Sequence, residues 1–167
     1  MITSISPIDG RYASKTDSLI NCFSEYALIR NRVIVEIYWL KALAKEAGIK
    51  QCRALSGGEE ALLDSIITGF DISEAEKIKE IEKTTNHDVK AVEYYLKDQI
   101  SGTSIEELSE FIHFACTSED INNLAHAMML KDGLSEILPI QKEITAVSYT
   151  HLRAHETRED LGLPLMG

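Results

Sequence analysis

This sequence lacks long apolar runs, a leader-like start and a cysteine pattern typical of cross-linking. No stretch approaches the roughly 20 apolar residues that a membrane-spanning helix needs. Its first four residues carry no basic region followed by an apolar run, so we expect no signal peptide. The three cysteines, Cys22, Cys52 and Cys116, are odd in number and widely spaced, which favours free thiols over disulfides or a metal knuckle. We therefore expect a cytoplasmic protein that does not bind membranes.

Basic residues are also few: the sequence has 17 Lys and Arg but 27 Asp and Glu, so the formal net charge is −10. Nucleic-acid binding rests on Lys and Arg contacts to phosphate, so this balance argues against a nucleic-acid partner and an anionic membrane surface. A small anionic substrate would need local cations and backbone N–H donors that act against the overall field. Arg11 and two predicted helix starts are the groups that can supply them.

Proline and glycine, which interrupt helices, account for only 3 and 9 of the 167 residues. Hydrophobic residues make up 44% and charged residues 26%, which is typical of a globular chain, and the length suits one ordinary domain with a core. Together with the many helix-forming residues, this predicts an all-α fold. The apolar spacing predicts helices at about 18–47, 59–70, 73–84, 88–100, 104–114, from 118, and from about 134 past 144.

The longest predicted helix has a face that we assign to core packing, with no chemistry. Its apolar positions recur at steps of four and three: Val33, Ile37, Leu40, Ala44 and Ala47. Two later helix starts have the spacing of a capping box, in which a hydroxyl residue is followed three positions later by a glutamate. These starts are at Ser56–Glu59 and Ser73–Glu76.

The stretch Lys83-Thr84-Thr85-Asn86-His87-Asp88-Val89 joins a charged helical run to an amphipathic one. Asn86 or Thr85 is expected to cap the second helix, because its side-chain oxygen can accept from an unpaired N–H. His87 then sits in or beside a first turn, where free N–H groups and the helix dipole favour an anion. Either His87 contacts a substrate there, or it is a surface residue beside an acid, Asp88, that complements the dipole.

A second helix start lies in Phe114-Ala115-Cys116-Thr117-Ser118-Glu119-Asp120-Ile121-Asn122-Asn123. Thr117 or Ser118 is the expected cap, and Glu119 and Asp120 fill the first turn, where acidic residues complement the dipole. His113, just before this stretch, is expected to be structural.

With a third block, these two stretches resemble the adenylosuccinate lyase family of the fumarase/aspartase superfamily. The residues that carry the resemblance are Ser6-Pro7-Ile8-Asp9-Gly10-Arg11-Tyr12, Thr84-Thr85-Asn86-His87-Asp88-Val89 and Thr117-Ser118-Glu119-Asp120. Three ordered blocks at family-like separations are more specific than any one of them, and the resemblance runs from about residue 5 to about residue 145.

The resemblance implies a lyase that eliminates fumarate from adenylosuccinate, giving AMP, and from the succinyl-carboxamide ribotide of purine biosynthesis. It implies a homotetramer built around a bundle of long helices, with a purine nucleotide substrate and with neither a metal nor an organic cofactor. Residues 1–110 would form the N-terminal helical domain, and residues 111–147 the truncated start of the bundle. Such a fragment is expected to be inactive alone.

The resemblance also carries substrate-binding roles to particular residues of this sequence. These are Arg11 and Tyr12 for the nucleotide; Asn86, His87 and Asp88 for the phosphate and the reacting bond; and Thr117 and Ser118 for a carboxylate. No complete catalytic set is implied, and whether His87 also assists proton transfer stays open.

The final segment, 148–167, does not resemble the family and is similar to a peptide translated from sequencing-adapter DNA. We expect an artefactual tail that is either a poorly packed helix or disordered. The Ser-x-Thr-His-x-Gln motif and the Gly- and Ser-rich loop of the family are not found in the sequence, and His151 receives no catalytic role. His151 and His155 would share one face of a helix, but without a third ligand we expect no metal there.

Two alternatives stay open. One is another lyase of the superfamily, such as argininosuccinate lyase or a fumarase, although the Ser6–Tyr12 block and the Thr-Asn-His-Asp-Val run favour the first family. The other is a non-catalytic helical interaction protein that keeps only bundle surfaces. A truncated bundle would leave apolar faces uncovered, so we expect self-association.

Overall fold

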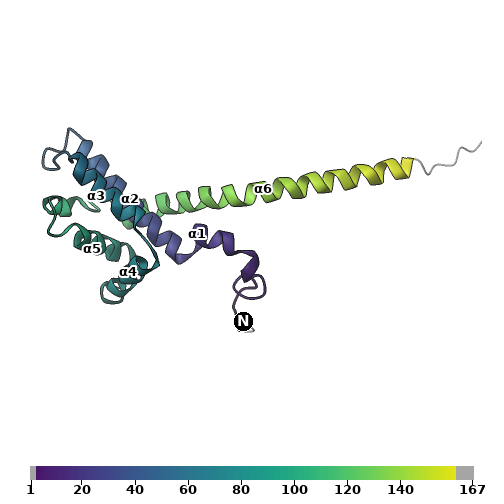
Figure 1. Ribbon diagram of the computed structural model, residues 1–167, viewed down its shortest axis with the longest axis horizontal. Helices are drawn as coiled ribbons and strands as arrows, with labels where there is room; N and C mark the ends of the chain where they lie inside the picture. Colours follow the sequence, from purple (N-terminus) through teal and green to yellow (C-terminus); the bar gives the residue numbers. More distant parts are fainter. Residues whose placement is uncertain (1–2, 161–167) are drawn as a thin grey trace, which may run out of the picture.

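The computed structural model describes residues 3–160, and this part of the chain is helical with no strand. The α-helices are α1 (Ile20–Phe23), α2 (Glu25–Lys45), α3 (Gly57–Thr68), α4 (Ile72–Thr85), α5 (Asp88–Ile100) and α6 (Ser118–Asp160). Short 3₁₀ helices span Ala13–Lys15, Asp17–Leu19 and Glu106–Phe111. Helices α2 to α5 gather at one end of the molecule and α6 runs away from them as a rod (Figure 1). The predicted all-α fold is confirmed, and no helix within residues 3–160 is long and apolar enough to cross a membrane.

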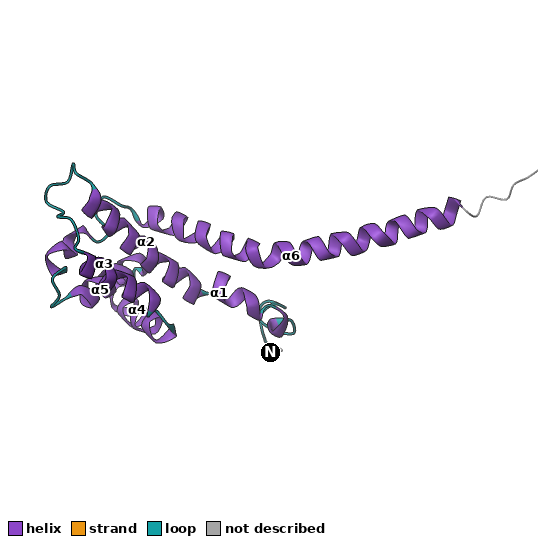
Figure 2. Ribbon diagram, turned by 45° about the horizontal axis from the view of Figure 1, so that its top comes forward, coloured by secondary structure: helices purple, strands orange, loops and turns teal. Residues whose placement is uncertain are grey.

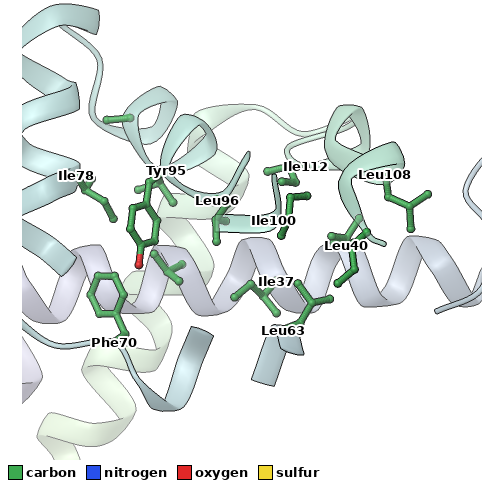
Figure 3. Close-up of a cluster of buried hydrophobic side chains, with 14 of the residues drawn as sticks. Ile37, Leu40, Leu63, Phe70, Ile78, Tyr95, Leu96, Ile100, Leu108 and Ile112 are labelled. Carbon is green, nitrogen blue, oxygen red and sulfur yellow. The ribbon is translucent and has the colours of Figure 1, made fainter. Parts of the chain in front are cut away.

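Helix α2 is the element around which α3, α4, α5 and α6 pack. Its predicted core face is confirmed at the first four positions, which are at most 5% exposed, but not at Ala47, which is exposed and lies beyond the end of α2. Figure 3 shows Ile37 and Leu40 of this face among side chains from other helices. The latter include Leu63, Ile78, Leu96, Ile100 and Leu108. Full burial of each such side chain is worth about 1.5–3 kcal/mol, so this cluster holds α2 to α5 together.

The two predicted capping boxes have different outcomes. Ser56 caps α3, since its Oγ accepts the Glu59 N–H at 3.3 Å while the Glu59 carboxylate accepts the Ser56 N–H at 2.7 Å. The second box, predicted to begin at Ser73, is wrong. Asp71 caps α4 instead, and its carboxylate also accepts the Ser73 hydroxyl at 2.7 Å. An ionised oxygen is the stronger acceptor, so it fixes the helix start two residues earlier.

The predicted continuous helix over 18–47 is broken at Ser24. This residue has an extended backbone (ψ 165°), and its Oγ accepts the Ala27 N–H at 3.2 Å, so it ends α1 and caps α2. The opposite error occurs near Leu134, where a new helix was predicted but α6 continues without a break. Gly133 lies inside α6 because it permits close packing: a Cβ there would lie 2.1 Å from the ring of Phe23.

Only the first part of α6 is buried. Its buried positions recur every four residues at Ile121, Ala125, Met129 and Gly133, and none of the later described side chains is buried. Beyond Gly133, α6 projects from the other helices as a rod (Figure 2). At 1.5 Å per residue, the whole of α6 is about 65 Å long. The exposed apolar residues beyond Gly133 are Leu134, Ile137, Leu138, Ile140, Ile144, Val147, Tyr149 and Leu152. An apolar face of this kind marks an interaction surface.

The segment predicted to be a tail begins as part of α6. Residues 148–160 continue the helix, and the side chains of residues 148–153 are exposed. Residues 161–167 lie outside the described part of the chain. The domain limits at residues 110 and 147 stay a prediction.

We expect the chain to self-associate through the exposed face of α6, because uncovered apolar surface favours association. Ile137→Gln combined with Ile144→Gln, two turns apart on this helix, should shift the chain toward monomer in sedimentation velocity. Ile72→Gln is the matched control, since Ile72 is 65% exposed but lies at the start of α4. A wild-type chain that sediments as a clean monomer would contradict this expectation.

Candidate functional site

The junction between α4 and α5 is formed by Asn86 and His87. Asn86 ends α4 with a left-handed backbone (φ 49°, ψ 30°), so the prediction that Asn86 or Thr85 caps α5 is wrong. His87 is the cap, because its Nδ1 accepts the Lys90 N–H at 3.2 Å. Asparagine tolerates left-handed geometry better than most residues, which explains why it ends one helix here rather than starting the next.

Helix α6 begins at Ser118, so the predicted helix start is confirmed, but within the described residues neither the Thr117 nor the Ser118 hydroxyl accepts a helix N–H as a cap would. The Thr117 N–H and hydroxyl both donate to the Asp120 carboxylate, at 2.7 and 2.9 Å, and these bonds hold the pKa of Asp120 below its usual value. Within the described residues no group accepts from the N–H of Ser118 or Glu119. Two donors of this helix start therefore remain available to a ligand.

The two helix starts meet at His87 and Ser118. The Ser118 Oγ lies 3.4 Å from the His87 Nε2. Because Nδ1 accepts a backbone N–H, the neutral imidazole carries its proton on Nε2 and donates toward Ser118. The His87 side chain is 50% exposed, so the pair is open to solvent. A small anion at this point would meet backbone N–H groups, an imidazole N–H and a hydroxyl, all of them donors.

A buried arginine ties both helix starts to α2. Arg32 is 6% exposed; its Nη2 donates to the Asp88 Oδ2 at 2.5 Å and its Nε donates to the Asn122 Oδ1 at 2.9 Å. The Asp88 Oδ1 accepts the Val89 N–H at 2.8 Å. Burial by itself would raise the pKa of Asp88, but the Val89 N–H and the Arg32 guanidinium outweigh it, so the pKa lies below its usual value. Asp88 is therefore an ionised anchor for Arg32.

Further along α2, two more side chains hold the turn that leads into α6. Glu36 is fully buried, accepts the His113 N–H at 3.1 Å and lies 2.6 Å from the His113 Nδ1. The Trp39 Nε1 donates to the Phe114 carbonyl at 2.8 Å. Burial raises the pKa of Glu36, although its hydrogen bonds with His113 oppose the rise. His113 thus has the structural role that was expected of it.

Sequence reasoning misses Arg32, Glu36 and Trp39 as part of this site, because their helix shows the pattern of core packing. One signal was present in the sequence. Arg32 and Glu36 are opposite charges four residues apart, on a helix whose neighbouring positions are apolar. Charged side chains are almost never fully buried without a partner, so two charges among apolar core positions indicate that each of them has a polar partner.

Arg11 and Tyr12 lie apart from this junction. They belong to the exposed N-terminal turn, where the Arg11 guanidinium lies 4.8 Å from the centre of the Tyr12 ring. The helix that follows this turn places Phe23 against Gly133, roughly 22 Å along α6 from Ser118. Both views show the turn beyond α1, on the side away from α4 and α5 (Figures 1 and 2).

A groove of about 690 Å³ runs between α2 and α6 beside the site. Its lining is mostly apolar and includes Val35, Tyr38, Trp39, Leu124 and Met128. Such a surface suits apolar packing better than a phosphate. In the described part of the chain no group of three or more His, Cys, Asp and Glu side chains could hold a metal ion. The side chain of His155, which pairs with His151 in the sequence, lies outside the described residues.

The family described as Lyase matches residues 10–158, so the chain belongs to this lyase family. The chain is 50% identical to the adenylosuccinate lyase of Escherichia coli (strain K12) over 145 residues, which cover 86% of this chain and 32% of that protein. It is 51% identical over 138 residues to the adenylosuccinate lyases of Vibrio cholerae serotype O1 and Legionella pneumophila (strain Corby), covering 82% of this chain and 30% of each. The chain spans about a third of the length of these curated relatives.

We expect His87→Ala and His87→Asn to separate helix capping from ligand contact. His87→Ala removes the cap and should lower the free energy of unfolding by about 1 kcal/mol. His87→Asn should keep wild-type stability, because asparagine is a strong cap, yet it removes the imidazole that faces Ser118. Urea unfolding of the three proteins measures this difference, and equal losses in both variants would contradict His87 as the cap.

We expect the pairing of Asp88 with Arg32 to stabilise the chain in a pH-dependent way. Because folding lowers the pKa of Asp88, its contribution is complete above the ordinary carboxyl pKa of about 4 and is lost as the pH falls through the lower folded value. Wild type should therefore exceed Asp88→Asn in unfolding free energy at pH 7, and the difference should shrink toward pH 3. The matched control makes the same Asp88→Asn comparison in the Arg32→Met variant. Without the guanidinium, the difference in unfolding free energy should depend much less on pH. A constant difference in wild type between pH 7 and pH 3 would exclude this role.

Proposed function

We propose that this chain supplies part of the substrate site of an adenylosuccinate lyase. Such an enzyme eliminates fumarate from adenylosuccinate, giving AMP, and acts in the same way on the succinyl-carboxamide ribotide of purine biosynthesis. The observation that carries the proposal is 50% identity to a curated adenylosuccinate lyase over 145 of the 167 residues. A match of that length includes residues 23–145, and so both helix starts.

The reaction explains why paired helix starts would matter. A base removes a proton from the carbon next to a carboxylate, the freed electron pair forms the double bond of fumarate, and the carbon–nitrogen bond breaks as an acid protonates the nitrogen. Negative charge builds on the carboxylate during this step, and preorganised donors lower the barrier. The N–H groups of Ser118 and Glu119 and the Ser118 hydroxyl are donors suited to that carboxylate. We assign neither the base nor the acid to this chain.

The contacts refine the roles expected for the other site residues. His87 offers its Nε2 proton to a phosphate or to the reacting bond, and the exposed Asn86 lies next to it. Asp88 is committed to Arg32 and the Val89 N–H, so its part is to hold the junction rather than to touch substrate. The Thr117 hydroxyl is committed to Asp120, which leaves Ser118 as the better donor to a carboxylate.

Arg11 and Tyr12 complete the proposed site at the nucleotide end. The planar guanidinium of Arg11 can pair with two phosphate oxygens at once. Since these residues lie far along α6 from Ser118 of the same chain, we propose that they serve a site shared between copies of the protein. The exposed apolar face of α6 supports a homotetramer with a core of long helices. The free thiols of Cys22, Cys52 and Cys116 suit the reducing cytoplasm.

Titration of the isotope-labelled chain with AMP and with fumarate tests this function. We expect fumarate to shift the amide signals of Ser118 and Glu119, and AMP to shift those near His87. Ser118→Ala should weaken fumarate binding because it removes a hydroxyl donor. Ser135→Ala is the matched control, since the Ser135 hydroxyl donates to the Lys131 carbonyl within α6, away from the junction.

Three outcomes would contradict parts of the proposal. A chain that responds to neither ligand would favour the non-catalytic helical interaction protein. A stronger response to argininosuccinate than to AMP and fumarate would favour another lyase of the superfamily. Cleavage of adenylosuccinate by the purified 167-residue chain would show that the base and acid lie within it.

A further inference from the structure

The turn that leads into α6 has a strained backbone. His113 (φ 60°) and Ala115 (φ 58°) are both left-handed although neither is glycine. A side chain with a Cβ disfavours this conformation, and it persists where the surroundings impose it. The two left-handed residues come directly before Thr117 and Ser118, so their backbone conformation sets the position of the start of α6.

Two side chains of α2 form hydrogen bonds with this turn. Glu36 accepts the His113 N–H and faces the His113 ring, so it fixes both the backbone and the side chain of that residue. Trp39 donates to the carbonyl of Phe114, which lies between the two left-handed residues. A fully buried carboxyl group such as that of Glu36 is unfavourable without partners, and here all of its polar contacts go to the turn.

We propose that Glu36 and Trp39 are positioning residues that deliver Ser118 to His87 by holding the 113–115 turn in its strained form. Neither side chain contacts His87 or Ser118, so both act through the turn. Arg32 holds α6 at Asn122, which follows Ser118 in the chain. The segment that precedes Ser118 is held by Glu36 and Trp39. This inference rests on the proposed function, because the junction is a site only if it binds the carboxylate and the nucleotide.

The test compares fumarate affinity in variants of the 167-residue chain. Glu36→Leu removes both acceptor oxygens and should weaken binding about tenfold, because the turn relaxes. Glu36→Gln keeps an acceptor for the His113 N–H and should retain affinity within about threefold. In this variant the side-chain NH₂ group must donate to the His113 Nδ1. The ¹⁵N signal of the His113 Nδ1 should therefore become that of an unprotonated ring nitrogen.

Two further variants separate positioning from a general loss of stability. Leu40→Ala lies one turn beyond Glu36 on α2 and should destabilise the core, yet it should leave the affinity of the folded chain unchanged. Ala115→Gly lowers the strain of a left-handed residue, so in combination with Glu36→Leu it should restore part of the lost affinity. A merely structural role for Glu36 predicts no rescue.

The outcomes distinguish this inference from the proposed function. If wild type binds fumarate and Glu36→Leu binds it equally well, the positioning role is overturned and the proposed function stands. If wild type binds neither ligand, the proposed function fails, and exchange of the Thr117 amide proton decides the inference. Faster exchange in Glu36→Leu than in Leu40→Ala supports it, and equal exchange overturns it. Should Glu36→Leu not fold, Trp39→Phe, which removes the indole N–H together with one ring of the indole but keeps an aromatic side chain, takes its place in both comparisons.

Discussion

The junction between α5 and α6 depends on the buried guanidinium of Arg32. A charge in this position, 6% exposed, needs partners, and it finds them in Asp88 at the start of α5 and Asn122 in the first turns of α6. Separating the two helix starts would leave the guanidinium without one of its two acceptors. The unfavourable desolvation of one side chain therefore keeps two distant segments of the chain together, and without it Glu36 and Trp39 could not place Ser118 beside His87.

Helix α2 has two structural roles, and different side chains carry each of them. Its apolar face, which includes Ile37 and Leu40, builds the core with α3, α4 and α5. Its polar side chains at Arg32, Glu36 and Trp39 hold the junction and the turn before α6. Changes on the apolar face should alter stability alone, whereas changes of these polar side chains should also alter where the donors of the site lie. Only the start of α6 shares in this arrangement, since its later side chains are exposed within the described residues.

Local patterns predicted what depends on local chemistry. The all-α fold, the core face of α2, the Ser56 capping box and the α6 start follow from spacing and capping rules. The caps at His87 and Asp71 were missed because several neighbouring side chains can compete for the same N–H groups. The continuity of α6 and the roles of Arg32 and Glu36 depend on partners far along the chain. The Arg32 partners are 56 and 90 residues away and the Glu36 partner is 77 residues away, beyond the reach of any local pattern.

The most direct test of this account is a proton–proton NOE between the His87 ring and the Ser118 side chain, measured in wild type and in Arg32→Met. Methionine has a similar length and suits the apolar surroundings, and Asp88, which is 45% exposed, can be solvated, so the variant should fold. The account predicts an NOE in wild type that is lost in Arg32→Met while the NOEs of the core around Ile37 persist. An NOE of equal strength in both proteins would show that the helix starts meet without Arg32, and would contradict the account.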